Sequence, residues 1–194
     1  MFYSIVKSIF RLFFLLFYPY KVEGRDNIPS KGPLIVCSNH ISWLDPPLIG
    51  VIMPRKVHFM AKEELFDIFL LGAAIKKLDA FPVKRGSADL KTIKTALKHL
   101  KNKEFLSLFP EGTRSKTGEI GEALPGVALI ALKSEAPVLP AAIKGRYKLF
   151  RKVKVNIGKP LVFPAYYGQK AKKELLEEIS SSIMNEIKRL RTTV

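Results

Sequence analysis

A histidine and an aspartate five residues apart are the first side chains of this sequence whose types could do chemistry together. They lie in the segment Asn39-His40-Ile41-Ser42-Trp43-Leu44-Asp45, directly after a short apolar run. A carboxylate that bonds one ring nitrogen of a histidine fixes its tautomer and stabilises the cation formed when the other nitrogen takes a proton. The spacing therefore indicates a general base, His40, oriented by Asp45. Alternatively, Asp45 caps a helix that Pro46 and Pro47 begin.

A second polar segment, Phe109-Pro110-Glu111-Gly112-Thr113-Arg114-Ser115, follows another short apolar run. Gly112 allows a ligand to approach the backbone closely. Thr113 and Ser115 supply hydroxyl groups, and Arg114 supplies a planar fork that fits a phosphate. The segment is therefore a candidate binding loop, although Glu111 and Arg114 could simply pair with each other.

Positive charge is the outlying property of the composition. Lysine and arginine total 33 and aspartate and glutamate total 17, which gives a net charge of +16. The segment Lys84-Arg85-Gly86 adds two of these cations after a short strand. Such a charge attracts nucleic acid, anionic lipid, phosphorylated substrates or an acidic carrier protein. The sequence has no nucleic-acid-binding motif, and its apolar N-terminal segment is unsuited to binding nucleic acid. We therefore do not expect a nucleic-acid partner.

The cysteine and histidine content limits the other kinds of site. The single cysteine, Cys37, excludes an internal disulfide. Three histidines without a CxxC or HExxH pattern predict no metal site. Cys37 could be a nucleophile paired with His40, but its place within an apolar run favours a buried structural thiol.

The first twenty residues are the most apolar part of the chain. Ser4, Lys7, Ser8 and Arg11 recur at helical spacing and form one polar stripe, with phenylalanine, isoleucine and leucine elsewhere. This pattern predicts an amphipathic helix at a lipid interface. A helix packed on the domain is the main alternative. A spanning or signal segment is disfavoured, because no apolar run reaches about 20 residues and no small-residue cleavage site follows.

The remaining chain alternates strands and helices. We expect strands at 34–37, 57–61, 80–83, 105–109, 138–143 and 153–157. We expect helices starting at Asp45, over 63–77 with a bend near Gly72, from a cap at Ser87 through Leu90 to 101, over 125–134 and over 170–191. This order predicts a single α/β domain, with a largely parallel mixed sheet flanked by helices. The predicted division is an interfacial helix at 1–20 and a domain at 21–194.

Four motifs together resemble those of the glycerolipid acyltransferases, and most closely of the members that acylate 1-acylglycerol 3-phosphate. The motifs are Asn39 to Asp45, Phe81-Pro82-Val83-Lys84-Arg85-Gly86, Phe109 to Ser115, and Ala136-Pro137-Val138-Leu139-Pro140-Ala141. Their order and separations match the family, and the resemblance covers roughly residues 20 to 165.

The resemblance implies transfer of an acyl group from a coenzyme A or acyl carrier protein thioester to lysophosphatidic acid, forming phosphatidic acid. His40 and Asp45 would be catalytic, and no metal or redox cofactor is implied. The implied substrate-binding residues are Lys84, Arg85, Gly86, Glu111, Gly112, Thr113, Arg114 and Ser115. The implied location is the cytoplasmic side of the cell membrane, on an anionic lipid surface. Another lysophospholipid or glycerol 3-phosphate as acceptor, and a non-enzymatic membrane-binding protein, remain alternatives.

Overall fold

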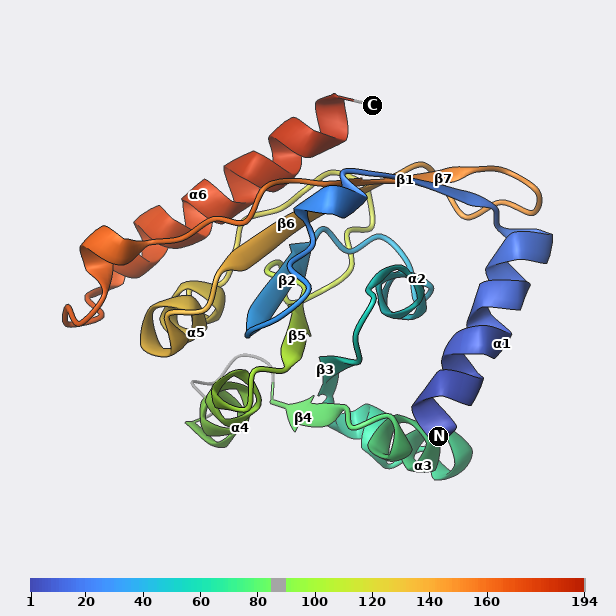
Figure 1. The fold of residues 1–194 in the computed structure, drawn as a ribbon, viewed down its shortest axis with the longest axis horizontal. Coiled ribbons are helices and arrows are strands. Elements are labelled where there is room, and N and C mark those ends of the chain that lie inside the picture. Colours follow the sequence, from blue (N-terminus) through green and yellow to red (C-terminus); the bar gives the residue numbers. More distant parts are fainter. Residues whose placement is uncertain (85–89, 194) are drawn as a thin grey trace.

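Seven strands form one sheet with helices on both faces in the computed structural model, which describes residues 1–84 and 90–193 (Figure 1). The strands are β1 (Tyr20–Glu23), β2 (Leu34–Ser38), β3 (Val57–Lys62), β4 (Phe81–Val83), β5 (Phe105–Leu108), β6 (Val138–Lys144) and β7 (Val153–Ile157). The α-helices are α1 (Phe2–Phe17), α2 (Asp45–Ile52), α3 (Phe69–Lys77), α4 (Leu90–Lys101), α5 (Gly126–Ser134) and α6 (Lys173–Thr192). Short 3-10 turns are η1 (Arg25–Asn27), η2 (Glu63–Phe66) and η3 (Pro164–Tyr166).

The sheet has the strand order β1-β7-β6-β2-β5-β3-β4. Neighbouring strands run parallel except for β6 and β7, which are antiparallel. The predicted α/β domain with a largely parallel mixed sheet is confirmed. Strand β1 was not predicted; it pairs with β7 at the sheet edge, with Tyr20 opposite Val153.

The central strand β2 is buried on both faces. Ile35 and Cys37 face the layer of α4, α5 and α6, whereas Leu34 and Val36 face α1 and α2. All four side chains are inaccessible to solvent. A strand covered on both sides needs an almost continuous apolar run instead of alternation, and this segment has one.

Helix α1 packs on the domain while it exposes an apolar outer side. Phe14 is fully buried and Phe10 and Phe13 pack beside it, against the core that includes α2. Lys7, which belongs to the predicted polar stripe, donates a hydrogen bond to the carbonyl of Met53 at the end of α2. Among the described residues, no helix has the length and apolar character needed to cross a bilayer.

The segment after β3 differs from its predicted form. Its break lies between η2 and α3, at Asp67 and Ile68, and Gly72 lies buried inside α3. A Cβ at Gly72 would lie 2.1 Å from the carbonyl oxygen of Phe66, so the glycine allows η2 to pack closely against α3. Leu90, the first residue of α4, is exposed. The predicted cap at Ser87 lies outside the described residues.

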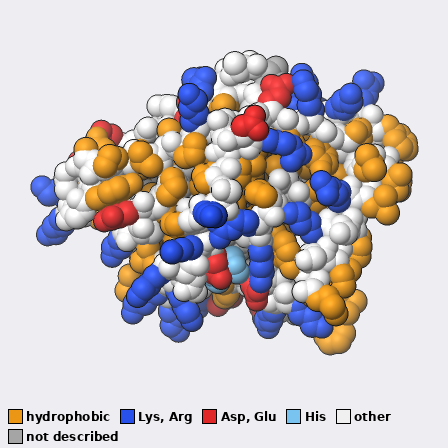
Figure 2. Space-filling view, in the orientation of Figure 1, with side chains coloured by type: hydrophobic (Ala, Val, Ile, Leu, Met, Phe, Trp, Pro, Cys, Tyr) orange, Lys and Arg blue, Asp and Glu red, His pale blue; other side chains and the backbone are white. Residues whose placement is uncertain are grey.

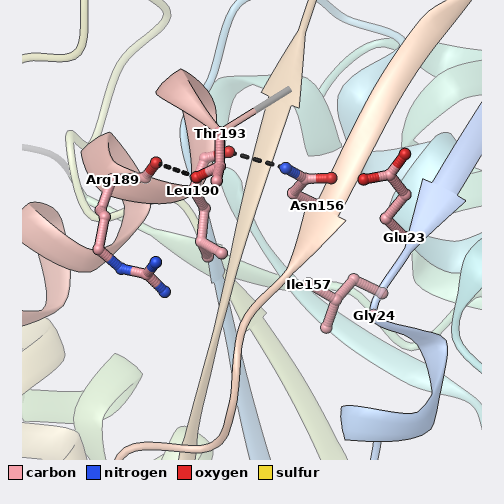
Figure 3. A pocket seen from close by; sticks show the side chains of 7 residues that line it. All are labelled: Glu23, Gly24, Asn156, Ile157, Arg189, Leu190 and Thr193. Carbon is pink, nitrogen blue, oxygen red and sulfur yellow. Dashed lines mark hydrogen bonds between the residues drawn. The ribbon is translucent and has the colours of Figure 1, made fainter.

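A small pocket of about 200 Å³ lies where β1, β7 and the end of α6 meet (Figure 3). It is lined by Glu23, Gly24, Asn156, Ile157, Arg189, Leu190 and Thr193. None of these residues belongs to the four sequence motifs, so the pocket is separate from the predicted site. Two of the lining residues are joined by a hydrogen bond, which the Asn156 amide donates to the carbonyl of Leu190 at 2.9 Å.

Gly24 joins β1 to η1, where both the backbone conformation and the close approach of another strand require glycine. Its φ is +74°, and a Cβ would lie 2.1 Å from the carbonyl oxygen of Ile157. We predict that Gly24→Ala lowers the free energy of unfolding by about 2 kcal/mol or more, through left-handed strain and the backbone clash. Denaturant unfolding measures the change.

Gly126→Ala is the matched control. Gly126 begins α5, and a Cβ there would meet no other atom within 4 Å. Alanine in an ordinary helical conformation should leave stability unchanged or raise it by up to about 1 kcal/mol. Equal effects of the two substitutions would contradict the packing assigned to Gly24.

Candidate functional site

The carboxyl ends of β2 and β5 bring the two polar motifs together. These strands are parallel neighbours, so the segments that follow them leave the sheet at the same edge. The backbone N–H of His40 donates to Oε1 of Glu111 at 3.0 Å, and the N–H of Ser115 donates to the His40 carbonyl at 2.8 Å. Two motifs separated by about seventy residues therefore form one site.

His40 and Asp45 are in direct contact. Nδ1 of the imidazole lies 2.8 Å from Oδ2 of the carboxylate, and both residues are buried. The ring also stacks on Phe109, with 4.1 Å between centroids. With Nδ1 held by the carboxylate, Nε2 is the nitrogen that can accept a proton from a bound molecule.

The Asp45 carboxylate points back along the chain instead of capping α2. Oδ2 accepts the backbone N–H groups of Ile41 and Ser42 at 2.6 and 2.7 Å. The N-cap of α2 is Leu44, and Asp45 is the first helical residue. The alternative role as N-cap is therefore wrong, although a carboxylate in the first turn still interacts favourably with the helix dipole.

Tyr147, in the segment between β6 and β7, was missed by the sequence analysis. Its hydroxyl donates to Oδ1 of Asp45 at 2.7 Å. Burial, together with the Asp45 carboxylate, raises the pKa of the Tyr147 phenol, which keeps it protonated as a donor. The two residues lie 102 positions apart, and no spacing rule connects them.

Asn39 fixes the end of β2 to β6. Its side-chain amide donates to the Ile143 carbonyl at 2.9 Å and accepts the Ile143 N–H at 2.7 Å. Because both bonds are buried and go to backbone, the residue before His40 has a defined position. His40 therefore follows a residue that is fixed to the sheet itself.

Arg114 extends from the second motif over an aromatic ring. Its guanidinium carbon lies 4.0 Å from the ring centroid of Trp43, and both side chains are exposed. The stacking holds the guanidinium on the same side as the His40 segment while its N–H groups stay available for an anion.

Lys84 lies at the same edge of the sheet but apart from this group. It follows β4, three strands from β2, which corresponds to about 14 Å at the usual strand spacing. Its Nζ lies 3.7 Å from Oε2 of Glu63. Arg85 and Gly86, the other predicted residues of this motif, lie outside the described residues.

A pocket of about 460 Å³ borders the second motif. It is lined by Glu111, Thr113, Ser115, Thr117, Glu119, Ile120, Gly121 and Glu122. Gly112 turns the chain here with a φ of +67°, and Glu111 Oε2 accepts the N–H of Gly121 at 3.0 Å. Among the described residues, three carboxylates and no cation line the pocket, so a phosphate is better placed on the Arg114 side of the loop.

Cys37 lies on the β2 strand, where it is fully buried. Burial raises the pKa of its thiol, which disfavours the thiolate that a nucleophile needs. The alternative of a cysteine nucleophile therefore finds no support in this environment.

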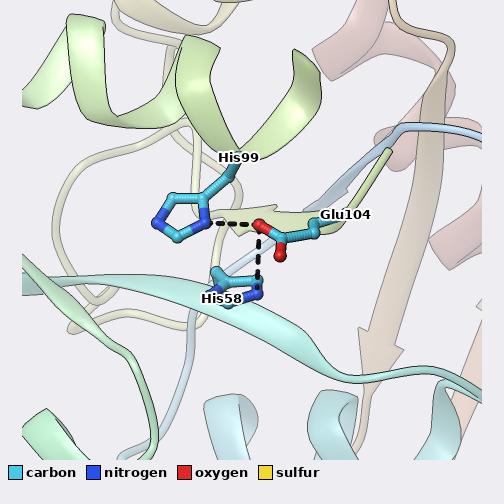
Figure 4. Close-up of side chains that lie close together, drawn as sticks. All are labelled: His58, His99 and Glu104. Atoms are coloured by element: carbon cyan, nitrogen blue, oxygen red, sulfur yellow. Dashed lines mark hydrogen bonds and ion pairs between the residues drawn. The ribbon is translucent and has the colours of Figure 1, made fainter. Parts of the chain in front are cut away.

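His58, His99 and Glu104 form a second cluster of chemical groups at the opposite edge of the sheet (Figure 4). Nδ1 of His99 lies 2.7 Å from Oε2 of Glu104, and the two imidazoles stack at 4.1 Å. Two ligands of one tetrahedral zinc ion lie about 3.3 Å apart, so this contact is a hydrogen bond that joins α4 to the start of β5. Burial is the main cause that lowers the pKa of His58.

Comparisons with known proteins agree with this arrangement. Residues 19–144 match the family model described as Acyltransferase. A 1-acyl-sn-glycerol-3-phosphate acyltransferase of Bacillus subtilis is 36% identical over 176 residues, which cover 88% of this chain and 87% of that protein. A lyso-ornithine lipid O-acyltransferase of Pseudomonas aeruginosa is 30% identical over 129 residues, covering 66% and 49%. The crystal structure of the LPA acyltransferase PlsC of Thermotoga maritima matches with a TM-score of 0.72 and 30% identity, covering 96% and 79%.

The hydrogen bond from Tyr147 to Asp45 should matter for stability. Tyr147→Phe leaves one lone pair of a buried carboxylate without its donor, which should lower the free energy of unfolding by about 1–3 kcal/mol. Tyr166→Phe removes a similar 2.7 Å bond, to Glu178, at an exposed position and should cost well under about 1 kcal/mol. If both substitutions lower the free energy of unfolding equally, the stabilising role of the Tyr147 hydrogen bond is contradicted.

Proposed function

Because this chain belongs to the acyltransferase family, we propose that it transfers a fatty acyl group from an acyl thioester to the sn-2 hydroxyl of 1-acylglycerol 3-phosphate. The product is phosphatidic acid. The observation that carries the proposal is the contact between His40 and Asp45 beside the Glu111 loop. The names of the Bacillus and Thermotoga relatives support the acceptor. The donor thiol belongs to coenzyme A or to acyl carrier protein, both of which suit the basic surface.

In the proposed reaction, Nε2 of His40 takes the proton of the acceptor hydroxyl. The hydroxyl oxygen then forms a bond to the thioester carbonyl carbon, and the carbon–sulfur bond breaks. The departing sulfur receives the proton from His40. The hydroxyl attacks directly, so the reaction needs no acyl-enzyme and no nucleophilic thiol.

Asp45 orients the base and stabilises its protonated form. Oδ2 bonds Nδ1 of His40, while Tyr147 holds Oδ1. These contacts restrain the carboxylate on both oxygens, so the imidazole has one tautomer and one direction. A negative charge next to Nδ1 also favours the imidazolium that exists between the two proton transfers.

Lys84, which lies apart from the other motifs, and Arg85 stay predicted substrate-binding residues from the sequence. The proposed ligand of the acceptor phosphate is Arg114. Its planar fork can bind two phosphate oxygens at once, and Trp43 holds it in place. Glu111 has a positioning role, because its two oxygens accept the N–H groups of His40 and Gly121. Gly112, Thr113 and Ser115 complete the proposed binding loop.

Helix α1 is the proposed contact with an anionic membrane on its cytoplasmic side. The outward side chains are Ile5, Ile9, Leu12, Leu15 and Leu16, each at least half exposed. The acceptor itself carries an acyl chain and so resides in a lipid layer. Peripheral binding through the apolar side of a helix places the enzyme where its substrate is.

A second candidate is acyl transfer to another lysolipid. The similarity to a protein named lyso-ornithine lipid O-acyltransferase favours it, because that relative has a different acceptor within the same family. An acyl-transfer assay that crosses lysophosphatidic acid, other lysolipids and glycerol 3-phosphate with both donor types tests the two candidates. Phosphatidic acid as the fastest product supports the first.

His40→Ala should lower kcat about 10²–10⁴-fold with the donor KM nearly unchanged, because a positioned base contributes a factor of that size. Asp45→Asn should also slow turnover through a misoriented imidazole, and unfolding measurements would show any loss of stability separately. Cys37→Ala, on the strand that precedes His40, is the matched control and should keep most activity. A folded His40→Ala protein with parental kcat would refute the assignment, as would a labelled acyl group trapped on Cys37.

Arg114→Lys keeps the charge but loses the planar fork and most of the stacking on Trp43. We predict a higher KM for the acceptor and a smaller change in the donor KM, measured by steady-state kinetics with one substrate varied at a time. Arg25→Lys, near the other edge of the sheet, is the control and should leave both KM values unchanged. Parental kinetics in Arg114→Lys would remove the phosphate role from this residue.

A further inference from the structure

Among the described residues outside α1, consecutive large apolar side chains are exposed at two places. In the segment between β6 and β7, Leu149 is 57% and Phe150 is 71% exposed. At the start of α3, Phe69 is 89% and Leu70 is 77% exposed, with Ile68 and Leu71 beside them. Consecutive apolar side chains in water are unfavourable and typically mark a surface that binds something.

The segment between β6 and β7 combines these apolar residues with positive charge. It reads Arg146-Tyr147-Lys148-Leu149-Phe150-Arg151-Lys152, with four cations around one apolar pair. An apolar tip enters the acyl region of a bilayer, while flanking lysines and arginines stay with the headgroups. Their charge is complementary to anionic phospholipid.

The backbone of Phe150 gives an independent observation. Its φ is +60°, in the left-handed region, where a bulky residue is strained and glycine is not. The chain thus has a large aromatic residue at a position where glycine would fold more easily, and most of that side chain lies in solvent. Folding does not explain this choice, which indicates that the side chain has a partner.

The two apolar places lie at opposite ends of α1. The N–H of Phe150 donates to the Phe17 carbonyl at 2.8 Å, at the end of the helix. Lys77 of α3 lies over the ring of Phe2 at 5.7 Å, at its start. Figure 2 shows apolar side chains gathered over both ends of α1, with lysine and arginine around them.

We propose that Leu149 and Phe150, together with Ile68 to Leu71, insert into an anionic phospholipid bilayer and form with α1 one membrane-binding face. The proposal rests on the proposed function in one respect, the membrane location of the acceptor. A second copy of the chain is a poorer occupant, because the cations beside Phe150 and at the end of α3, Lys76 and Lys77, would face each other across such an interface.

The face also determines where the active site lies relative to the lipid. Tyr147, two residues before Leu149, donates to Asp45 and packs edge-on against Tyr18. The inserted tip is therefore joined directly to the carboxylate that orients His40. A lysolipid that leaves the bilayer near Phe150 has a short path to the base.

The test uses co-sedimentation of the full chain with phosphatidylglycerol/phosphatidylcholine vesicles, without acyl donor or acceptor. Phe150→Gly should weaken vesicle binding at least about ten-fold, through the loss of a buried aromatic side chain. The same variant should unfold at an equal or higher denaturant concentration, because glycine relieves the left-handed strain. A structural role for Phe150 predicts the opposite change in stability.

Phe69→Ser tests the α3 contact at a side chain almost fully in solvent, and Val162→Ser is the matched control. Val162 is 58% exposed and lies outside the face, so its substitution should not change vesicle affinity. Parental vesicle affinity in both Phe150→Gly and Phe69→Ser overturns the proposal. The proposal is also overturned if Phe150→Gly or Phe69→Ser binds vesicles as before but no longer self-associates without lipid in sedimentation velocity, because the face would then bind a second copy of the chain.

Vesicle binding needs no turnover, so the two proposals can fail separately. If vesicle binding depends on Phe150 and Phe69 but the protein forms no phosphatidic acid, the membrane-binding face stands and the proposed reaction is refuted. If the protein forms phosphatidic acid but Phe150→Gly and Phe69→Ser bind vesicles as the parent does, the proposed reaction stands and the membrane-binding face is refuted.

Discussion

The buried carboxylate of Asp45 is the constraint on which the rest of the site depends. A charge removed from water is costly unless hydrogen-bond donors replace its hydration. Here the donors come from the adjoining turn, at Ile41 and Ser42, and from Tyr147 far along the chain, while His40 occupies the remaining contact. The requirement to compensate one charge therefore fixes the position of two loops and the direction of one imidazole.

The strand order explains why these groups can meet. β2 lies between β5 and β6, so the segments that follow these three strands leave the sheet side by side. They supply His40, which is the proposed base, the Glu111 loop and Tyr147. The antiparallel return of β7 then keeps the segment after β6 short, which holds Tyr147 close to Asp45 and to the end of α1.

Sequence reasoning succeeded where the signal is local. The apolar runs predicted six strands, and the predicted helix over 170–191 corresponds to α6, which buries Ile179, Ile183 and Ile187. The spacing of His40 and Asp45 predicted their contact, because five residues are enough to close one turn.

It failed where the deciding partner is distant in sequence. The strand order brings Tyr147 within hydrogen-bond distance of Asp45. The packing of α1 on α2 does the same for Lys7 and the Met53 carbonyl. The four residues of β1 alternate between exposed and partly buried, so they resemble a linker until β7 is beside them. Gly72 was predicted to bend a helix, but close packing by the η2 backbone explains it instead.

The stacking of Arg114 on Trp43 has a spectroscopic consequence. The sequence contains one tryptophan, so all indole emission of the protein originates beside the proposed phosphate ligand. A cation close to the ring face and contact with water both alter that emission. An anion that draws the guanidinium away changes the environment of this fluorophore without any added label. Selective excitation of Trp43 would therefore report whether an anion occupies the site.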